Sequence, residues 1–558
     1  MNEDQGPTIA PPITELPIKT AKGGFYHGFS THVTIPSKLI VSMLIVWAIA
    51  FPSMANKTLG IANETIIHLF SSWYVLLVGL FLVFCVVLAI LPISGRLKLG
   101  CPGDEPEFSR FSWFAMMFGA GLGIGMLTYS TGEPLSHLTN NPEIIAGHVG
   151  AVTQEAVGPA YLYSYLHWGF SAWAIYATIG LSVGYVAYRR GLPLTIRSGL
   201  VPLIGHRLTG LPGHIVDIVA VVATILGIAV TLGLGVEQFV QGLNRIGMGD
   251  WLLNADGLAS NSAIVVALLI IVGASTISAL SGVGRGIKWL SNLNLVLSLI
   301  LFAAFLIFGA TLFSLKLITF GTFDYLLSLP RLAFTFSRPD GTEIGNAIAQ
   351  WQLDWTVFYW AWWIAFAPFV GMFVARVSKG RTVREYIIGV VLAPALMCFV
   401  WLSVIGGTAV DLVISGASNG SILSTVMSDQ LYATISALMD SGLAHAFSIL
   451  VVVLLLTYVI TSADSAILIV NTINAAGKDD DHGRQHTLFW GVAIALVVGS
   501  LLIIGGLDAV RTAMIIGALP FSFVSALMAI SVGKAIWRDS IREKHGVAST
   551  LPIPPANG

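Results

Sequence analysis

The chain contains few charged residues. Only 10% of its 558 residues are Asp, Glu, Lys or Arg, whereas 55% are hydrophobic, and the mean hydropathy is +0.82. A soluble domain usually carries about 25% charged residues. A chain this apolar has too few polar side chains to cover a surface that faces water. The composition therefore excludes an ordinary soluble protein and predicts one whose solvent is lipid.

The signatures of several other protein classes are also absent. The net charge is −1, so no basic surplus points to a nucleic-acid partner. The three cysteines, Cys85, Cys101 and Cys398, form neither a metal-ligand spacing nor a disulfide framework. There is no HExxH, Walker-type loop, pair of intramembrane aspartates or pore-loop motif. We therefore expect neither a channel nor an enzyme. An intramembrane enzyme stays a distant alternative, which conversion of substrate in detergent would reveal.

Long apolar runs are abundant. A helix needs about 20 apolar residues to cross the hydrocarbon core of a bilayer. Twelve runs approach or exceed this length, near 38–56, 71–94, 112–132, 159–188, 212–243, 261–281, 293–316, 351–377, 385–408, 441–473, 486–506 and 512–536. We predict an all-α integral membrane protein. It has a tail at 1–37, a twelve-helix domain at 38–537 and a short tail at 538–558.

The basic residues predict the orientation. With the N-terminus in the cytoplasm, the outside segments hold six of the 28 Lys and Arg residues and the inside segments hold the other 22 (28 − 6). Cytoplasmic loops are enriched in Lys and Arg. Both termini are therefore predicted to be cytoplasmic, which agrees with an even number of spans.

The third run contains FGAGLGIGMLTYSTGEP, with glycines at 119, 121, 123 and 125. Glycine inside a helix costs roughly 1 kcal/mol relative to alanine, so this cluster predicts a helix that breaks in mid-membrane. Irregular backbone is tolerated there where it lines a cavity or is buried in protein. Its N–H groups can hold a carboxylate and its carbonyls a cation. The alternative is close helix packing through small residues.

Aromatic residues cluster inside two other runs. The fourth contains Trp168, Trp173 and Tyr176, which share an arc of roughly 140° on a helix. The eighth contains Trp355, Trp360, Trp362, Trp363 and Phe366. Tryptophan normally gathers at the membrane interfaces, whereas these residues lie well inside long runs. Aromatic cages recognise quaternary ammonium groups, although aromatic packing in a tight core would explain the same pattern.

Polar groups inside other runs are candidates for ion binding. In the tenth run, Thr461, Ser462 and Ser465 offer hydroxyl oxygens and Asp464 a carboxylate. The alternative is that the hydroxyls bond carbonyls of their own helix. Elsewhere, His167 is interpreted as a core histidine, and Asp217 as a helix cap or one half of an ion pair near a cytoplasmic end.

Together these stretches resemble the betaine/carnitine/choline transporter family. The residues that carry the resemblance are GAGLGIG followed by TGEPLSH, then HWGFSAWAIY, VDIVAVVATILGIAVTLGLG, DWTVFYWAWWIAFAPFVGMFVARVSKGRTVRE, YVITSADS and GALPFSF. They extend over about 38–537. The resemblance implies a secondary transporter in which helices 3–7 and 8–12 form two inverted five-helix repeats. It also implies alternating access to a substrate at the midplane.

The resemblance also implies site residues. The substrate set comprises the aromatic residues Trp168, Trp173, Tyr176, Trp360, Trp362, Trp363 and Phe366, with the glycines Gly121, Gly123 and Gly125. The sodium set comprises Gly119, Leu122, Tyr458, Thr461 and Ser462. Two residues correspond to a second sodium site, Thr224 and Phe369, but Ile228 stands where the family pattern has a threonine. One coupled ion is therefore expected rather than two.

Gly125 stands where choline carriers of the family tend to have an acidic residue. The resemblance therefore implies a betaine-type zwitterion, either glycine betaine or a sulfonium analogue such as dimethylsulfoniopropionate. The TSADS string implies cation symport, with Na⁺ as the coupling ion and no other cofactor. A proton-coupled choline or carnitine carrier or exchanger is the main alternative. The remaining expectations are the inner membrane of a bacterium, a role in osmoprotection and a homotrimer.

Overall fold

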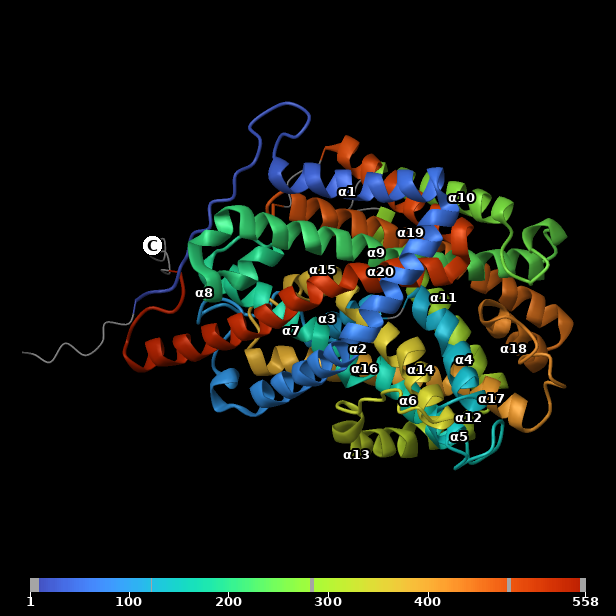
Figure 1. The fold of residues 1–558 in the computed structure, drawn as a ribbon. Coiled ribbons are helices and arrows are strands. Elements are labelled where there is room, and N and C mark those ends of the chain that lie inside the picture. Colours follow the sequence, from blue (N-terminus) through green and yellow to red (C-terminus); the bar gives the residue numbers. More distant parts are fainter. Residues whose placement is uncertain (1–9, 122, 282–285, 479–482, 552–558) are drawn as a thin grey trace, which may run out of the picture.

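The computed structural model describes residues 10–121, 123–281, 286–478 and 483–551. Within these ranges the chain is helical, and its extended pairings are three isolated bridges outside any strand. Figure 1 shows an elongated helical bundle. The end of α20 and the short helix α8 (Val201–Ile204) lie at one end, whereas α17 (Gly407–Ile414) and α18 (Gln430–Leu438) lie at the other.

Each predicted apolar run coincides with a helix. The first six correspond to α1 (Thr31–Ala50), α2 (Pro52–Ile90), α3 and α4 (Arg110–Gly121 and Ile124–Thr139), α6 and α7 (Val157–Trp168 and Phe170–Arg190), α9 (Leu211–Arg245) and α10 (Asn261–Ser281). The last six correspond to α11 (Gly286–Phe308), then α14, η6 and α15 (Glu343–Gln352, Leu353–Val357 and Phe358–Arg376), then α16, η7 and α17 (Val383–Trp401, Leu402–Gly406 and Gly407–Ile414), then α19 (Ser441–Asn474) and both arms of α20 (Arg484–Lys544).

Short helices connect these spans. They are η1 (Pro92–Gly95), α5 (Pro142–Ile145), η2 (Ile196–Leu200), α8, η3 (Gly205–Thr209), η4 (Asp250–Leu252), α12 (Thr311–Lys316), η5 (Leu317–Gly321), α13 (Thr322–Leu332), η8 (Met427–Asp429) and α18.

In the described part of the chain, 10 helical stretches are long and apolar enough to cross a membrane. The stretch Thr311–Leu332 is one of them, although no predicted run covers it. Arg484–Lys544 contains two predicted spans, whereas broken α3–α4 and α10 are not among the 10.

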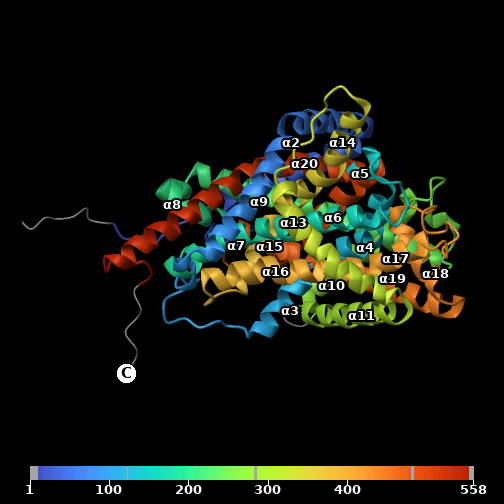
Figure 2. The same ribbon diagram turned by 90° about the horizontal axis from the view of Figure 1, so that it is seen from below.

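Burial separates inner helices from outer ones. The most apolar windows of Val157–Arg190 and Glu343–Arg376 are 94% and 83% buried, whereas that of Trp289–Phe308 is only 28% buried. Exposed apolar side chains on an outer helix suit contact with lipid. Figure 2 shows α4, α6, α7 and α15 in the middle of the bundle, between α2 and α20 on one side and α11 on the other. The aromatic runs therefore belong to its interior.

Helix α20 contains a reversal at Gly505 and Gly506. Gly506 has φ +64°, a conformation that glycine adopts readily. The first arm begins at His486, which bonds Lys38 near the start of α1, and a side chain at Gly505 would meet Asn56, beyond the end of α1. The second arm then follows α2. The two predicted spans therefore form an antiparallel hairpin with almost no loop.

Buried ion pairs hold the end of the bundle near α8. Arg197 Nε donates to Asp217 Oδ2 over 2.6 Å, and both side chains are fully buried. Asp539 on α20 pairs with Arg190 at 3.2 Å and Arg542 at 2.6 Å. Of the two interpretations of Asp217, the ion pair is thus confirmed.

Candidate transport site

The third span breaks where its glycines cluster. Helix α3 ends at Gly121 and α4 begins at Ile124, after Gly123 in an extended conformation. The break predicted from the sequence is therefore confirmed. Leu122 lies outside the described residues. Because the first backbone N–H groups of a helix lack partners within that helix, the start of α4 is suited to an anionic group.

Gly125 brings this break against the aromatic helices. A Cβ atom at this position would lie 2.8 Å from Trp362 Cη2 and 3.4 Å from the Trp168 ring. Glycine is thus required sterically, because any side chain would displace a ring. The glycine cluster and the two aromatic runs, which are distant in sequence, meet at this point.

Four aromatic residues form one group, which we call the aromatic cage: Trp168, Trp173, Tyr176 and Trp363. The ring of Trp363 lies 5.3 Å from that of Trp168, 5.4 Å from Tyr176 and 6.4 Å from Trp173. The first two contacts are edge-to-face, with interplanar angles of 88° and 76°. All four side chains are buried. Edge-to-face contacts are favourable because the positive edge of one ring meets the negative face of the next.

Hydrogen bonds fix two rings of the cage. Trp363 Nε1 donates to the backbone carbonyl of His167 over 2.9 Å. Trp168 Nε1 donates to Glu133 Oε2 over 2.6 Å. These bonds join α15 to α6 and α6 to α4. The orientation of the cage thus depends on groups outside it.

Glu133 is the centre of a fully buried cluster formed with His137 and His167. Its Oε1 lies 2.6 Å from His167 Nδ1 and 3.2 Å from His137 Nε2. Its Oε2 accepts from Trp168 and from the Tyr359 hydroxyl. The other nitrogen of His167 lies 3.0 Å from the Thr356 hydroxyl.

Hydrogen bonds alone account for the arrangement of these three side chains. The cluster's three residues, one glutamate and two histidines, are of types found in transition-metal sites, and their potential ligand atoms lie within 4.8 Å of one another. However, Glu133 already bonds both imidazoles directly. We therefore describe it as a hydrogen-bonded cluster, in which His167 is a satisfied core histidine as the sequence indicated.

Tyr129 covers the cage from one side. It lies one helical turn after Gly125, on the same face of α4. Its ring lies 6.2 Å from that of Trp168 and 6.0 Å from that of Trp362. Its hydroxyl accepts a 2.7 Å hydrogen bond from Arg511 on α20, and the partly exposed guanidinium lies over the Phe358 ring at 4.8 Å. Arg511 and Tyr129 thus lie between the cage and the part of the protein surface where Arg511 is exposed.

The other predicted aromatic residues lie around the cage. Trp362 stacks on Trp363 with ring centroids 5.9 Å apart. Trp360 is buried and meets the His167 ring at 6.1 Å. Phe366 is half-buried and packs edge-to-face on Phe369 at 5.1 Å. Trp362 therefore adjoins the cage directly, whereas Trp360 is in contact with the buried cluster.

The predicted sodium residues of α19 face α11. The Tyr458 hydroxyl lies 3.0 Å from that of Ser298, and Thr461 Oγ1 accepts from Asn294 Nδ2 over 3.1 Å. Thr461 also donates to a carbonyl of its own helix, as the alternative interpretation has it. Ser462 is half-buried. The surroundings of Gly119, at the end of α3, lie outside what is described. The complete sodium set stays a prediction.

One contact joins this part of α19 to the helix break. A Cβ atom on Gly235 of α9 would lie 2.6 Å from Val459 and 3.2 Å from Ile124. Ile124 is the first residue of α4, and Val459 adjoins Tyr458. Since Gly235 separates the two side chains so narrowly, α19 passes close to the break between α3 and α4.

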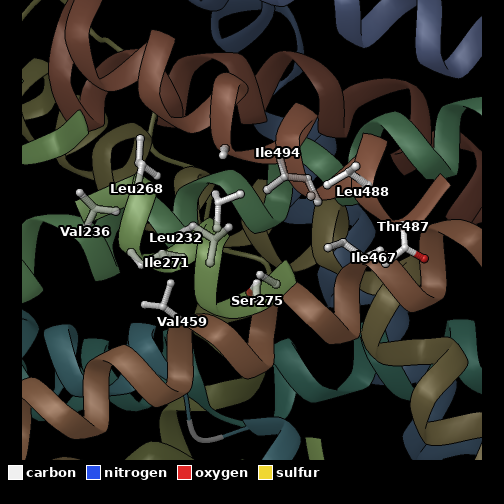
Figure 3. Close-up of a pocket in the computed structure, with 14 residues that line it drawn as sticks. Leu232, Val236, Leu268, Ile271, Ser275, Val459, Ile467, Thr487, Leu488 and Ile494 are labelled. Atoms are coloured by element: carbon white, nitrogen blue, oxygen red, sulfur yellow. The ribbon is translucent and has the colours of Figure 1, made fainter. Parts of the chain in front are cut away.

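A cavity of about 30 Å³ borders the same helix. Figure 3 shows that Leu232, Val236, Ile271 and Val459 are among its lining residues. Its polar contribution comes from Ser275 and Thr487. This apolar lining does not suit a cation, which requires several oxygen ligands.

The residues of the doubtful second ion site lie where α9 and α15 pack closely. Thr224 is buried and donates to the Ala220 carbonyl of its own helix over 2.8 Å. Phe369 packs on Phe366. A Cβ atom on Gly227 would lie 3.1–3.2 Å from Ala365 and from the backbone of Phe366. Because the Thr224 hydroxyl has an intrahelical partner, the geometry gives this site no further support.

Sequence reasoning missed Glu133, His137, Tyr129 and Tyr359. Glu133 and His137 stand in the TGEPLSH string, which had been used only to define the resemblance. An ionisable group at membrane depth is a candidate functional group by default. Applied to Glu133, which directly follows the third run, this rule would have singled it out. One partner, His137, lies at the i, i+4 spacing on the same helix and was predictable. The other three were not, because they come from α6 and α15.

Comparison with known proteins agrees with this arrangement. A sequence model of the betaine/carnitine/choline family transporters matches residues 32–541. The chain belongs to this family. It is 36% identical to the glycine betaine transporter OpuD of Bacillus subtilis over 502 residues, which cover 90% of this chain and 93% of OpuD.

Two relatives from Acinetobacter baylyi differ in their named substrates. A glycine betaine transporter is 36% identical over 530 residues, covering 94% of this chain and 76% of the relative. The osmo-dependent choline transporter BetT2 is 35% identical over 523 residues, covering 93% and 73%. This family member is therefore a multi-pass membrane transporter rather than an enzyme. Similarity alone does not choose between glycine betaine and choline.

Proposed function

We propose that this transporter imports a betaine-type zwitterion, glycine betaine or a sulfonium analogue such as dimethylsulfoniopropionate, by Na⁺ symport with alternating access. The observation that carries the proposal is the aromatic cage. A quaternary ammonium group has no N–H to donate, so aromatic faces suit it better than hydrogen-bond acceptors do. Burial strengthens this attraction, since desolvated cation–π contacts are worth about 2 kcal/mol or more.

The surroundings of the cage favour a zwitterion over a simple cation. Gly125 contributes no side chain beside Trp168 and Trp362, so position 125 itself supplies no acidic group to balance a cation that lacks a carboxylate. The buried carboxylate that does contact the cage, Glu133, already accepts hydrogen bonds from Trp168, Tyr359 and two histidines. The N-terminus of α4 offers N–H groups and the positive end of a helix dipole to a substrate carboxylate. In this arrangement the ammonium group enters the cage and the carboxylate faces the break.

Sodium coupling rests on the oxygen groups of α19. Thr461 and Ser462 offer hydroxyls near the broken helix, and Val459 is close to Ile124 at the start of α4. Hydroxyl and carbonyl oxygens are suitable ligands for a small hard cation. The alternative is a proton-coupled choline or carnitine carrier, for which the α19 hydroxyls would be structural.

We further propose that the protein lies in the inner membrane of a bacterium as a homotrimer, with both termini in the cytoplasm. The orientation is supported by the concentration of basic residues in the segments on that side, whereas the trimer and the inner membrane follow from the family resemblance alone. Orientation is measurable by the accessibility of a single cysteine introduced into either tail of a cysteine-free variant. Labelling from the outside would contradict this orientation.

The decisive experiment is uptake of radiolabelled glycine betaine into proteoliposomes, with and without an inward Na⁺ gradient. We expect accumulation driven by Na⁺, competition by dimethylsulfoniopropionate and little competition by choline. Accumulation driven equally by a proton gradient without Na⁺ would favour the alternative. Preferential uptake of choline would contradict the argument from Gly125.

A further inference from the structure

The Glu133 cluster carries an unusual combination of charge and burial. Glu133, His137 and His167 are each 0% exposed. With both imidazoles neutral and the carboxylate ionised, the cluster has a net charge of −1. Four hydrogen bonds stabilise the carboxylate, but among the described residues no cation pairs with it directly. A buried charge without an ionic partner is costly, and binding a proton or a counter-charge lowers that cost. Histidine is the side chain that most readily changes its charge between pH 5 and 8.

The groups facing the cluster supply little compensating charge. The titratable side chains in contact with it are Tyr163 of α6 and Tyr359 of α15. Tyr129 of α4 lies behind them, packed on Trp168 and Tyr359. One side chain further out are the charged groups Arg511, beyond Tyr129, and Glu143 and Arg331, beyond Tyr163. Trp351, Trp355 and Thr356 complete the surroundings. Among the described residues, the nearest cationic groups are thus separated from Glu133 by an aromatic ring.

The cluster is also in direct contact with the cage. Glu133 accepts from the indole N–H of Trp168, and the backbone carbonyl of His167 accepts from that of Trp363. A carboxylate that accepts a hydrogen bond from the indole N–H polarises the ring and raises its electron density. The indole face then attracts a cation more strongly. The charge state of the cluster therefore affects the cation affinity of the cage.

We propose that the Glu133–His137–His167 cluster is a proton-binding site linked to the aromatic cage. When the cage is empty, one imidazole holds a proton and forms an imidazolium–carboxylate pair of zero net charge. When a quaternary ammonium group enters, its positive charge takes over this compensation and the proton leaves to solvent. By linkage, the proton and the ammonium group weaken each other's binding. This proposal rests on the proposed function, because it takes the cage to be the ammonium site.

The sign distinguishes this linkage from proton symport. In symport through this cluster, proton and substrate would be bound together and each would strengthen the other. Here the two compete, so affinity for substrate rises with pH. One linked proton changes the dissociation constant by at most tenfold per pH unit.

Calorimetry on the purified full chain in detergent tests the proposal. Glycine betaine, choline and tetramethylammonium are titrated separately at pH 6, 7 and 8, in buffers of different ionisation enthalpy. We expect up to one proton to be released per bound ligand and affinity to rise with pH. Glu133→Gln should bind more weakly, release no proton and show no pH dependence, since its amide oxygen still accepts from Trp168 but bears no charge.

A matched control is available in the same part of the chain. Glu155 is exposed and is not among the groups around the cluster, so Glu155→Gln should leave proton release unchanged. His137→Phe keeps an aromatic ring beside Trp351 and Trp355 and should alter the pH range of the linkage. Ligand binding by the wild-type protein without proton release would overturn the proposal, as would equal release by Glu133→Gln.

The test also separates this proposal from the proposed function. Failure of all three ligands to bind at any pH would contradict the assignment of the cage. The tryptophan fluorescence of the ligand-free protein then still reports on the cluster through Trp168. A change in emission with pH that Glu133→Gln abolishes would support the proton site, and identical titrations of the two proteins would overturn it.

Discussion

The backbone of Gly125 and the indole ring of Trp362 are in such close contact that a Cβ atom on Gly125 would lie 2.8 Å from the ring. This contact joins the broken third span to the aromatic helix α15. It also makes position 125 a sensitive point for testing the transport site, because even one methyl group must displace a ring.

We expect Gly125→Ala to raise the KM for glycine betaine about tenfold or more, because Trp362 and Trp168 must move. The variant should remain folded, since alanine is favoured over glycine in a helix by about 1 kcal/mol. Gly158→Ala in α6 is the matched control, because its Cβ atom would meet nothing within 4 Å. Equal uptake by both variants would contradict the packing argument.

Trp363→Ala should weaken glycine betaine binding by about tenfold or more. One desolvated face of an aromatic cage contributes on the order of 1–2 kcal/mol to binding of a cation. Binding to the purified variant is the measurement, together with its yield as a folded protein. Trp537, which is 70% exposed on α20, provides the control substitution Trp537→Ala. An unchanged dissociation constant in well-folded Trp363→Ala would refute the cage assignment.

Replacing Thr461 and Ser462 together by alanine should raise the Na⁺ concentration needed for half-maximal uptake. Both hydroxyl ligands are then lost, and Asn294 loses its acceptor on Thr461. Thr457→Ala is the control. Its hydroxyl lies one turn earlier and also donates to a carbonyl of its own helix, at 2.9 Å. A sodium dependence identical to that of the wild type would show that the Thr461 and Ser462 hydroxyls do not bind Na⁺ and serve only to bond their own helix.

Asp217→Ala should be strongly destabilising, by about 3–5 kcal/mol, because it leaves the buried Arg197 guanidinium uncompensated. Thermal unfolding in detergent measures the effect. Arg110→Ala removes a mostly exposed partner of Glu385, whose other partner Arg381 remains, and should cost at most about 1 kcal/mol. Equal melting temperatures for the two variants would show that the Arg197–Asp217 pair contributes little.

The sequence predicted those features that depend on neighbouring residues. Four glycines within seven positions indicated the break between Gly121 and Ile124, and each apolar run became a helix. The membership of the aromatic cage was also available, since Trp168, Trp173 and Tyr176 share a helix face and the resemblance added Trp363. The break and the shared face of α6 and α7 required only helix geometry and residue type, whereas Trp363 required the family resemblance.

Features that depend on contacts between distant helices were not predicted. Glu133 is bonded to side chains of α6 and α15 as well as to His137 of its own helix. The i, i+4 spacing indicates the contact with His137, but no spacing indicates the contacts with α6 and α15. The bond between Arg511 and Tyr129 joins residues 382 positions apart. The Thr461 hydroxyl donates to a carbonyl of its own helix, as is usual for a hydroxyl inside a membrane helix. Its second contact, with Asn294 of α11, depends on how the two helices pack and was not predictable.

The hairpin in α20 has a consequence for how the chain is assembled into the bilayer. Only Gly505 and Gly506 separate the two arms, which is as short as connections between antiparallel helices become. With so short a connection, neither arm can cross the membrane while the other remains in water. We therefore expect the last two spans to enter lipid together, as a helical pair. Because Gly506 has φ +64°, any residue with a Cβ atom at position 506 would strain the turn and should impair biogenesis before it affects transport.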